Sequence, residues 1–330
     1  ICEAVADVTA GKRPSYLGDI NAPLIETERV VSTGEDWAYI KIAEGCDNHC
    51  SYCVIPSLRG RFRSRCMEDI VREAEELADM GIRELIVVAQ DVTRYGTDLY
   101  GRRALPELLE RLCRIDGFKW IRLHYLYPDE IDDELIDVIA RESKILNYLD
   151  IPIQHIDDGV LKLMNRRGTG DEIRALFKKL RESLPGLVLR TSIIAGLPGE
   201  GEEEFEELCS FLREAKIERA GVFQYSPEEG STAAEMERPD EDTARRRTEI
   251  LMQIQAEVMD EYNRSCIGRE FEVLYEGVDE QTGLCFGRSY AESPDVDGRI
   301  LMRGDPDGRD FVTVRITGEI DGELLGEITE

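Results

Sequence analysis

The sequence predicts an α/β fold for most of the chain and a small all-β barrel at its end. Two observations support this prediction. Between about residues 38 and 226, short apolar strand patterns alternate with longer amphipathic helix patterns. Beyond residue 268 the pattern changes to short strands separated by turns rich in glycine and aspartate. A chain of 330 residues is long enough for one main domain and a small second one.

Six strand patterns, each followed by a helix pattern, define the main domain. In residues 67–80, for example, Ile70, Ala74 and Leu77 recur on one helical face, and Gly81 ends the pattern. Such units make a parallel sheet with right-handed crossovers, and the pattern alone does not separate an open doubly wound sheet from a partial barrel. We expect strands at 37–43, 84–89, 120–124, 148–153, 187–195 and 220–225, and helices at 67–80, 105–115, 131–141, 157–164, 171–184 and 202–215.

The end of the chain has a different texture. A long helix is expected at 242–264, because apolar residues recur there at helical spacing. Short strands are then expected at 271–275, 284–289, 299–302 and 311–316, which suits a small barrel.

Composition restricts the classes of function. The formal net charge of −28 disfavours a nucleic-acid partner, although Arg59, Arg61, Arg63 and Arg65 form a basic stretch. No apolar run approaches the roughly 20 residues that span a membrane, and no export leader is visible. Nine cysteines in a long chain suggest thiols in a reducing compartment, so we expect a cytoplasmic protein. Cys113 and Cys209 lie on apolar helix faces, where a buried and inert thiol is expected.

Three of the cysteines form one motif. Cys46, Cys50 and Cys53 have the spacing C-x3-C-x2-C and follow the first expected strand. Three thiolates on a four-iron cluster leave one iron open to a substrate. A structural zinc site is the alternative, with His49 as fourth ligand, but His49 adjoins Cys50 and the paired spacing of zinc sites is missing. A cluster protein without catalytic function is a further alternative.

This motif, with Tyr52 before its last cysteine, resembles that of the radical S-adenosylmethionine (radical SAM) superfamily. Longer segments resemble the methylthiotransferases of that superfamily. The resemblance implies a partial (β/α)6 TIM-like barrel followed by a TRAM β-barrel. The expected domains are a remnant of an N-terminal domain with a linker (1–35), the radical SAM core (36–238), a connecting helix (239–265) and the TRAM domain (266–330). The segments are residues 39–65, which include IKIAEGCDNHCSYC, and AQDVTRYG (89–96), LDIPIQH (149–155), RTSIIAGLPGE (190–200) and YSPEEGSTAA (225–234).

The resemblance also implies cofactors and site residues. Cys46, Cys50 and Cys53 would hold a 4Fe-4S cluster and so be the catalytic and metal-binding residues. The cluster would cleave S-adenosylmethionine to a 5′-deoxyadenosyl radical. Residues at or near strand ends would bind the S-adenosylmethionine, although each could instead be a polar group with a structural role. These expected cofactor-binding residues are Tyr52, Gln90, Asp91, Gln154, Arg190, Ser192 and Gly196.

Two branches of the family compete for the substrate. The RimO-like branch methylthiolates the β-carbon of an aspartate in ribosomal protein S-twelve, and the MiaB-like branch methylthiolates an adenosine in tRNA. The segments QDVTRYG (90–96) and RLHYLYP (122–128) resemble the first branch more closely. Residues 266–330 contain six arginines and no lysine against sixteen acidic residues, a formal charge of −10. That charge suits a basic ribosomal protein better than RNA. An electron donor such as flavodoxin or ferredoxin is expected.

The sulfur chemistry is expected to need more than this chain. Full-length members of the family have an N-terminal domain with three further cysteines and a second cluster, whereas only Cys2 precedes residue 38 here. Because the chain starts at Ile1, we expect a fragment that binds one cluster and S-adenosylmethionine without completing sulfur insertion.

Overall fold

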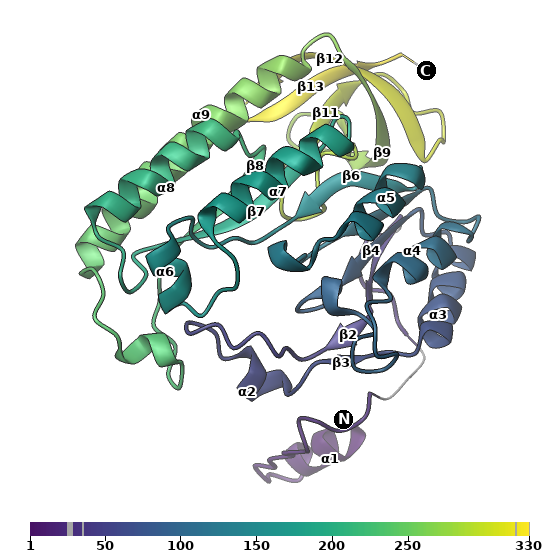
Figure 1. The fold of residues 1–330 in the computed structure, drawn as a ribbon. Coiled ribbons are helices and arrows are strands. Elements are labelled where there is room, and N and C mark those ends of the chain that lie inside the picture. The colour runs from purple at the N-terminus through teal and green to yellow at the C-terminus, as the bar shows by residue number, and fades with distance from the viewer. Residues whose placement is uncertain (25–28, 35, 321, 330) are drawn as a thin grey trace.

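The main domain is built on a parallel six-stranded sheet with the strand order β1-β4-β5-β6-β7-β8 (Figure 1). The computed structural model describes residues 1–24, 29–34, 36–320 and 322–329. Within these residues β1 and β8 are edge strands that do not pair with each other, so the sheet stays open as a partial barrel. The α/β prediction is therefore confirmed. The strands are β1 (Trp37–Lys41), β4 (Glu84–Val88), β5 (Trp120–Leu123), β6 (Ile145–Asp150), β7 (Val188–Ala195) and β8 (Arg219–Gln224).

Amphipathic helices cover one face of this sheet (Figure 1). Because side chains alternate along a strand, Ile121 and Leu123 of β5 join the core beneath the helices, whereas Trp120 and Arg122 lie on the opposite face. The cysteines Cys113 and Cys209 are buried, as predicted. The helices are α3 (Met67–Asp79), α4 (Leu105–Cys113), α5 (Asp133–Arg141), α6 (Asp158–Leu163), α7 (Gly170–Ser183) and α8 (Glu202–Ala215).

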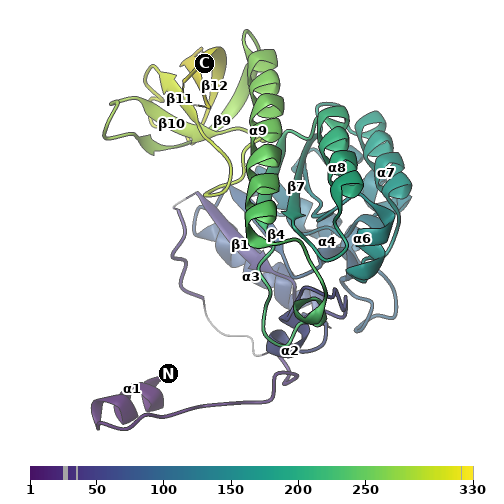
Figure 2. The same cartoon turned by 90° about the vertical axis from the view of Figure 1, so that its left-hand side faces the viewer.

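A long helix, α9 (Glu241–Cys266), connects the sheet to the C-terminal barrel (Figure 2). Its N-terminus is capped by Asp240, whose carboxylate accepts a hydrogen bond from the backbone N–H of Thr243 at 2.7 Å. The barrel is closed, with the strand order β10-β11-β13-β12-β9. Its strands are β9 (Glu270–Val278), β10 (Cys285–Arg288), β11 (Ile300–Arg303), β12 (Phe311–Ile320) and β13 (Glu323–Ile328).

Several predicted boundaries differ from the structure. β6 begins at Ile145 rather than at residue 148, and it ends at Asp150. The strand predicted at 37–43 divides, because β2 (Ala43–Glu44) leaves the sheet and pairs with β3 (Arg63–Ser64). β13 was not predicted because its sequence, ELLGEI, has a weak strand pattern and depends on long-range pairing with β11 and β12. The remaining elements are α1 (Cys2–Thr9), α2 (Ile55–Arg59) and the short 3₁₀ segments η1 (Val92–Arg94), η2 (Pro128–Glu130) and η3 (Thr232–Glu235).

The C-terminal barrel packs against the face of the sheet that the helices leave uncovered. Trp120 contacts Phe311 edge to face, with ring centroids 4.9 Å apart. The segment between β10 and β11 also reaches this face, where Tyr148 Oη donates to the carboxylate of Asp297 at 2.7 Å. Trp120 is the first residue of β5, so its contact with the barrel lies near the strand starts. The carboxyl ends of the strands remain available for a site.

Among the described residues, no helix is both long enough and apolar enough to cross a bilayer.

Candidate functional site

The three cysteines of the motif lie on the loop between β2 and α2. Gly45 turns the chain into this loop with φ +80°, a left-handed conformation that favours glycine. A β-carbon at this position would lie 2.1 Å from the carbonyl oxygen of Arg61, so a larger residue does not fit without movement. The backbone N–H of Cys46 donates to the carbonyl oxygen of Gly60 at 3.2 Å. The loop is thus closed against the segment that follows α2.

All three thiols line one cavity of about 400 Å³ at the carboxyl ends of the strands. Cys46 Sγ accepts a hydrogen bond from the backbone N–H of Asn48, and Cys53 Sγ accepts one from Ile55, each at 3.4 Å. Burial raises the pKa of Cys46 to about 11 and also raises the pKa of Cys53. These sulfurs therefore need a cationic partner, such as iron, to be thiolates at neutral pH.

The spacing of the donors bears on which metal centre they fit. Among the described residues, no three His, Cys, Asp or Glu side chains are gathered tightly enough for a single metal ion. A tetrahedral zinc ion would draw its sulfurs to about 2.3 Å from one point. A cluster separates its thiolates by the irons and sulfides between them. Three thiols around one cavity fit the cluster better.

Four of the predicted cofactor-binding residues line the same cavity: Tyr52, Gln90, Gln154 and Ser192. Gln90 Oε1 is buried and has no hydrogen-bond donor among the described residues. A buried amide oxygen without a partner is costly, so this atom suits a ligand that carries N–H or O–H groups. Gln154 adopts φ +70° and forms a parallel bridge with Ile193 of β7, which holds it at the cavity wall. The cavity volume falls within the usual range for small-molecule sites, roughly 300–1,000 Å³.

The other three predicted residues, Asp91, Arg190 and Gly196, lie outside the set that lines this cavity. The carboxylate of Asp91 accepts hydrogen bonds from the Asn48 side-chain amide at 2.7 Å and from the backbone N–H of Thr93 at 3.1 Å. Asp91 thus connects the cysteine loop to the segment after β4.

Arg190 and Gly196 have structural partners of their own. Arg190 Nη1 lies 2.7 Å from the carboxylate of the buried Asp150, on the sheet face that the C-terminal barrel covers. The backbone N–H of Gly196 donates to the Glu200 carboxylate at 3.0 Å. Buried His155 accepts a hydrogen bond at Nδ1 from the backbone N–H of Asp157, and its Nε2 lies 3.3 Å from Glu200.

Sequence reasoning missed several residues of the cavity wall, namely Asn48, Tyr125, Tyr127 and Arg166. Tyr125 follows β5 and adopts φ +61°, which is rare for an aromatic residue. Tyr125 and Tyr127 could have been found from the sequence because they come shortly after a predicted strand. Arg166 follows the short helix α6, and an arginine in a turn carries no comparable signal.

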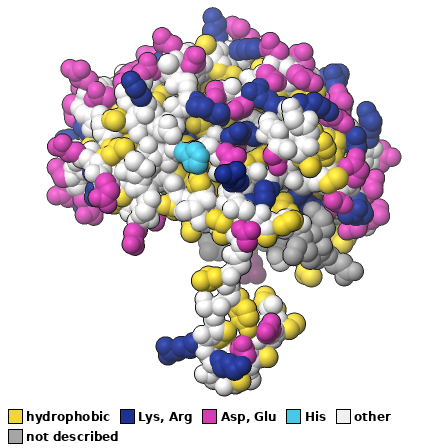
Figure 3. All heavy atoms as spheres, turned by 60° about the horizontal axis from the view of Figure 1, so that its bottom comes forward, with side chains coloured by type: hydrophobic (Ala, Val, Ile, Leu, Met, Phe, Trp, Pro, Cys, Tyr) yellow, Lys and Arg dark blue, Asp and Glu magenta, His cyan; other side chains and the backbone are white. Residues whose placement is uncertain are grey.

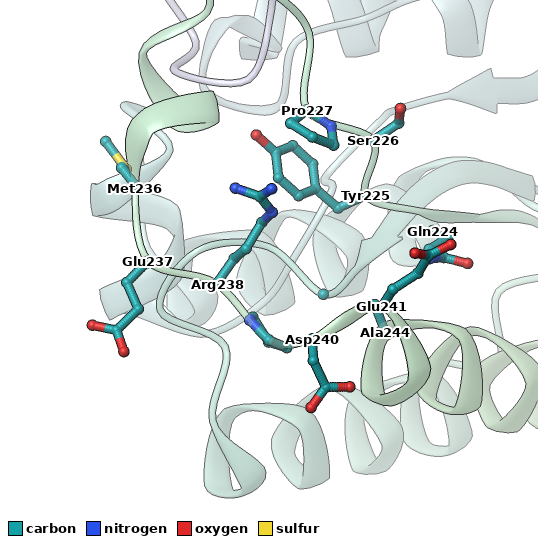
Figure 4. A pocket seen from close by; sticks show the side chains of 12 residues that line it. Gln224, Tyr225, Ser226, Pro227, Met236, Glu237, Arg238, Asp240, Glu241 and Ala244 are labelled. Atoms are coloured by element: carbon teal, nitrogen blue, oxygen red, sulfur yellow. The ribbon is translucent and has the colours of Figure 1, made fainter.

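A second cavity, of about 850 Å³, is lined by residues of the β8–η3 and η3–α9 segments (Figure 4). Figure 4 shows Tyr225 and Arg238 on one side of it and Asp240 on another. Gly196 is the one predicted site residue among its lining residues. The cavity contains no cysteine, so the chemistry of the motif belongs to the smaller cavity.

Comparison with known proteins identifies the group to which the chain is related. Residues 40–212 match the model of the radical SAM superfamily, and residues 267–329 match that of the TRAM domain. The ribosomal protein uS12 methylthiotransferase RimO of Symbiobacterium thermophilum is 48% identical over 100% of this chain and 69% of its own length. The RimO of Pelotomaculum thermopropionicum is 50% identical over 95% of this chain and 70% of its own length.

A solved structure supports the fold. Coproporphyrinogen III oxidase (HemN) from Escherichia coli, a radical SAM enzyme, superposes with a TM-score of 0.50 over 87% of this chain and 68% of that one, at 19% identity. At that identity the similarity shows the fold alone. The motif, the cavity that it lines and the relatives at 48% and 50% identity agree with one another. The chain therefore belongs to the radical SAM superfamily and, within it, to the RimO family of methylthiotransferases.

Proposed function

We propose that this chain is the catalytic part of a methylthiotransferase that modifies the β-carbon of an aspartate in ribosomal protein uS12. The observation that carries the proposal is the similarity over nearly the whole chain to proteins named uS12 methylthiotransferase, at 45–50% identity. The three thiols around one cavity support the same reaction class.

The roles of the residues follow from their places in the cavity. Cys46, Cys50 and Cys53 would hold a 4Fe-4S cluster through their thiolates. When bound, the cluster together with S-adenosylmethionine supplies the radical that removes a hydrogen atom from carbon. Gln90 offers an acceptor to a polar group of the S-adenosylmethionine. Apolar wall residues such as Val88 and Leu126 limit the access of water to the cavity.

Charge supports a protein substrate over tRNA. The segment from residue 266 to the end has a formal charge of −10 and no lysine. The face in Figure 3 has basic side chains near its middle and acidic side chains toward both sides, so the support from charge comes from the C-terminal segment and not from this face. An acidic surface repels a phosphate backbone and attracts a basic ribosomal protein. The alternative substrate, an adenosine of tRNA as in the MiaB-like branch, lacks this support.

Mass spectrometry tests the proposal. Protein uS12 is isolated from cells with the full-length enzyme, without it, and with its Cys50→Ala variant. We expect one methylthio group on one aspartate in the first case and none in the others. Unmodified uS12 in all three, together with a methylthio group on tRNA only in cells with the intact enzyme, would establish the alternative.

Some finer points belong to the same proposal. We place one cluster on this chain and expect a second in another domain of the family enzyme. The electron donor would be a small redox protein such as flavodoxin or ferredoxin. Nine unpaired cysteines suit the cytoplasm. The proposed domains are the N-terminal remnant and linker (1–35), the radical SAM core (36–238), the connecting helix (239–265) and the TRAM domain (266–330).

A further inference from the structure

Arg166 lies in the wall of the cysteine cavity, directly beside Cys50. Its Nη1 is 3.9 Å from Cys50 Sγ and 3.5 Å from the Tyr52 hydroxyl. Its Nη2 donates to the carbonyl oxygen of Pro152 at 2.5 Å. The guanidinium also lies over the ring of Tyr127, 4.3 Å from its centroid. These contacts fix the plane of the guanidinium and direct one edge toward the sulfur.

The turn that carries Arg166 is fastened to the cysteine loop by hydrogen bonds. Ser51 donates its backbone N–H to the carbonyl oxygen of Met164 at 2.9 Å and its hydroxyl to that of Leu163 at 2.8 Å. Asn165 adopts a left-handed φ of +52° and donates its amide to the carbonyl oxygen of His49 at 2.7 Å. The turn and the loop are therefore one unit, so the position of Arg166 relative to Cys50 is set by backbone contacts.

The charge of Arg166 has no carboxylate counter-ion in this part of the structure. None of the described carboxylates pairs with its guanidinium, whose nearby polar groups are a thiol, a phenol and a carbonyl. The adjacent Arg167 differs, because it pairs with Asp129 at 3.0 Å and Glu130 at 2.8 Å. The Arg166 side chain is partly buried in the cavity wall, and a cation withdrawn from water is costly unless an anion compensates it. The group expected in front of Arg166 is therefore negative.

We propose that Arg166 is the fixed counter-charge of the iron–sulfur cluster, and that it positions the Cys50 side of the cluster and favours its reduced form. This inference rests on the cluster site of the proposed function. A four-iron cluster with three thiolate ligands is anionic, and reduction adds one more negative charge. A positive charge held close to a ligand sulfur stabilises the reduced state more than the oxidised state. Net charge and hydrogen bonds to sulfur are among the features that set the potentials of such clusters.

The test is the one-electron midpoint potential of the reconstituted cluster, measured without S-adenosylmethionine and without uS12. The variants are Arg166→Gln, Arg166→Lys and, as a matched control, Arg167→Gln. The control removes an arginine that also lies over the Tyr127 ring, at 4.7 Å, but is paired with carboxylates. Circular dichroism and iron content are measured on each variant.

We expect Arg166→Gln to make reduction at least tenfold less favourable, which is a fall of about 59 mV for one electron. Arg166→Lys keeps the charge and should stay near the wild-type potential, as should Arg167→Gln. A folded Arg166→Gln variant that loses its cluster while Arg166→Lys retains it would also support the counter-charge.

Three results would overturn the inference: an unchanged potential in Arg166→Gln, an equal shift in Arg167→Gln, or loss of the cluster or fold in both Arg166 variants. An unchanged potential would mean that Arg166 serves only to bind the carboxylate of S-adenosylmethionine, which is absent from the measurement. Loss of the cluster or fold in both variants would mean that its role is structural packing. A wild-type protein that binds no iron would instead refute the cluster site and, with it, the proposed function.

Discussion

Replacement of Glu84 by glutamine should destabilise the docking of the C-terminal barrel against the sheet. Glu84 is the first residue of β4 and is fully buried. Its carboxylate lies 2.6 Å from Nε of Arg122, which is also fully buried, and 2.8 Å from Nη1 of Arg288, which comes from the barrel. The one carboxylate therefore compensates arginines from both domains.

The structure sets the size of the effect. Removing one partner of a buried ion pair costs roughly 3–5 kcal/mol, because the charge left behind stays buried. Arg288 keeps Glu276 at 2.6 Å, and Arg122 keeps the carbonyl oxygen of Tyr290 at 2.8 Å. We therefore expect the lower end of that range, about 3 kcal/mol, in the free energy of unfolding.

Urea unfolding followed by tryptophan fluorescence measures this change, since Trp120 contacts Phe311 edge to face between the domains. The matched control is Glu272→Gln. Glu272 pairs with Lys119 across the same contact at 2.5 Å, but the two side chains are 49% and 43% exposed. Loss of an exposed pair costs less than about 1 kcal/mol. Equal unfolding midpoints for the two variants would refute the reasoning.

Three further predictions concern the cysteine loop and the same buried carboxylate. Gly45→Ala should abolish most iron binding, because the added β-carbon would lie 2.1 Å from a backbone oxygen. Gly81→Ala should retain iron binding, because nothing lies within 4 Å of its β-carbon. Equal iron content in the two variants would contradict this prediction. Cys46→Ala should remove the visible absorbance of the reconstituted cluster, and the buried Cys113→Ala should not; absorbance retained by the first variant would exclude that thiol as a ligand. Burial acts to raise the pKa of Glu84, but its two arginine partners outweigh burial and hold the pKa below the ordinary value of 4.5. A carboxylate whose pKa is lowered by folding stabilises the fold above its ordinary pKa, and this stabilisation is lost as the pH falls. The stability advantage of the wild type over Glu84→Gln should therefore shrink in acid. An advantage that is the same at neutral pH and at about pH 3 would contradict the ion pair.

Local sequence patterns predicted most of the elements of the main domain. Helix α3 was predicted nearly to its end because its apolar residues recur at helical spacing and Gly81 terminates it. The prediction was less accurate for strands that are defined by pairing with distant parts of the chain. The prediction of a strand at 148–153 is wrong at both ends, because β6 is defined by pairing with β5 and β7. β13 exists because the closed barrel supplies partners on both of its sides.

The residues of the candidate site likewise include some that the sequence predicted correctly and some that it did not. The motif formed by Cys46, Cys50 and Cys53 was visible in the sequence because all three cysteines come from one short loop. Gln90, Gln154 and Ser192 were expected to bind the cofactor because of the family resemblance and their places at or near strand ends, and all three line the cavity. The rule does not say which side chains near a strand end face the cavity, so it could not foresee that Arg190 would pair with Asp150 instead.

The sequence by itself determined the fold class, the cysteine motif and the acidic character of the C-terminal barrel, since periodicity, spacing and charge are properties of the chain before it folds. Only the tertiary structure decided what surrounds the motif. Arg166 and Cys50 are separated by 116 positions, and Glu84 and Arg288 belong to different domains. Contacts of this kind depend on how packed elements close upon one another, and no local pattern encodes that closure.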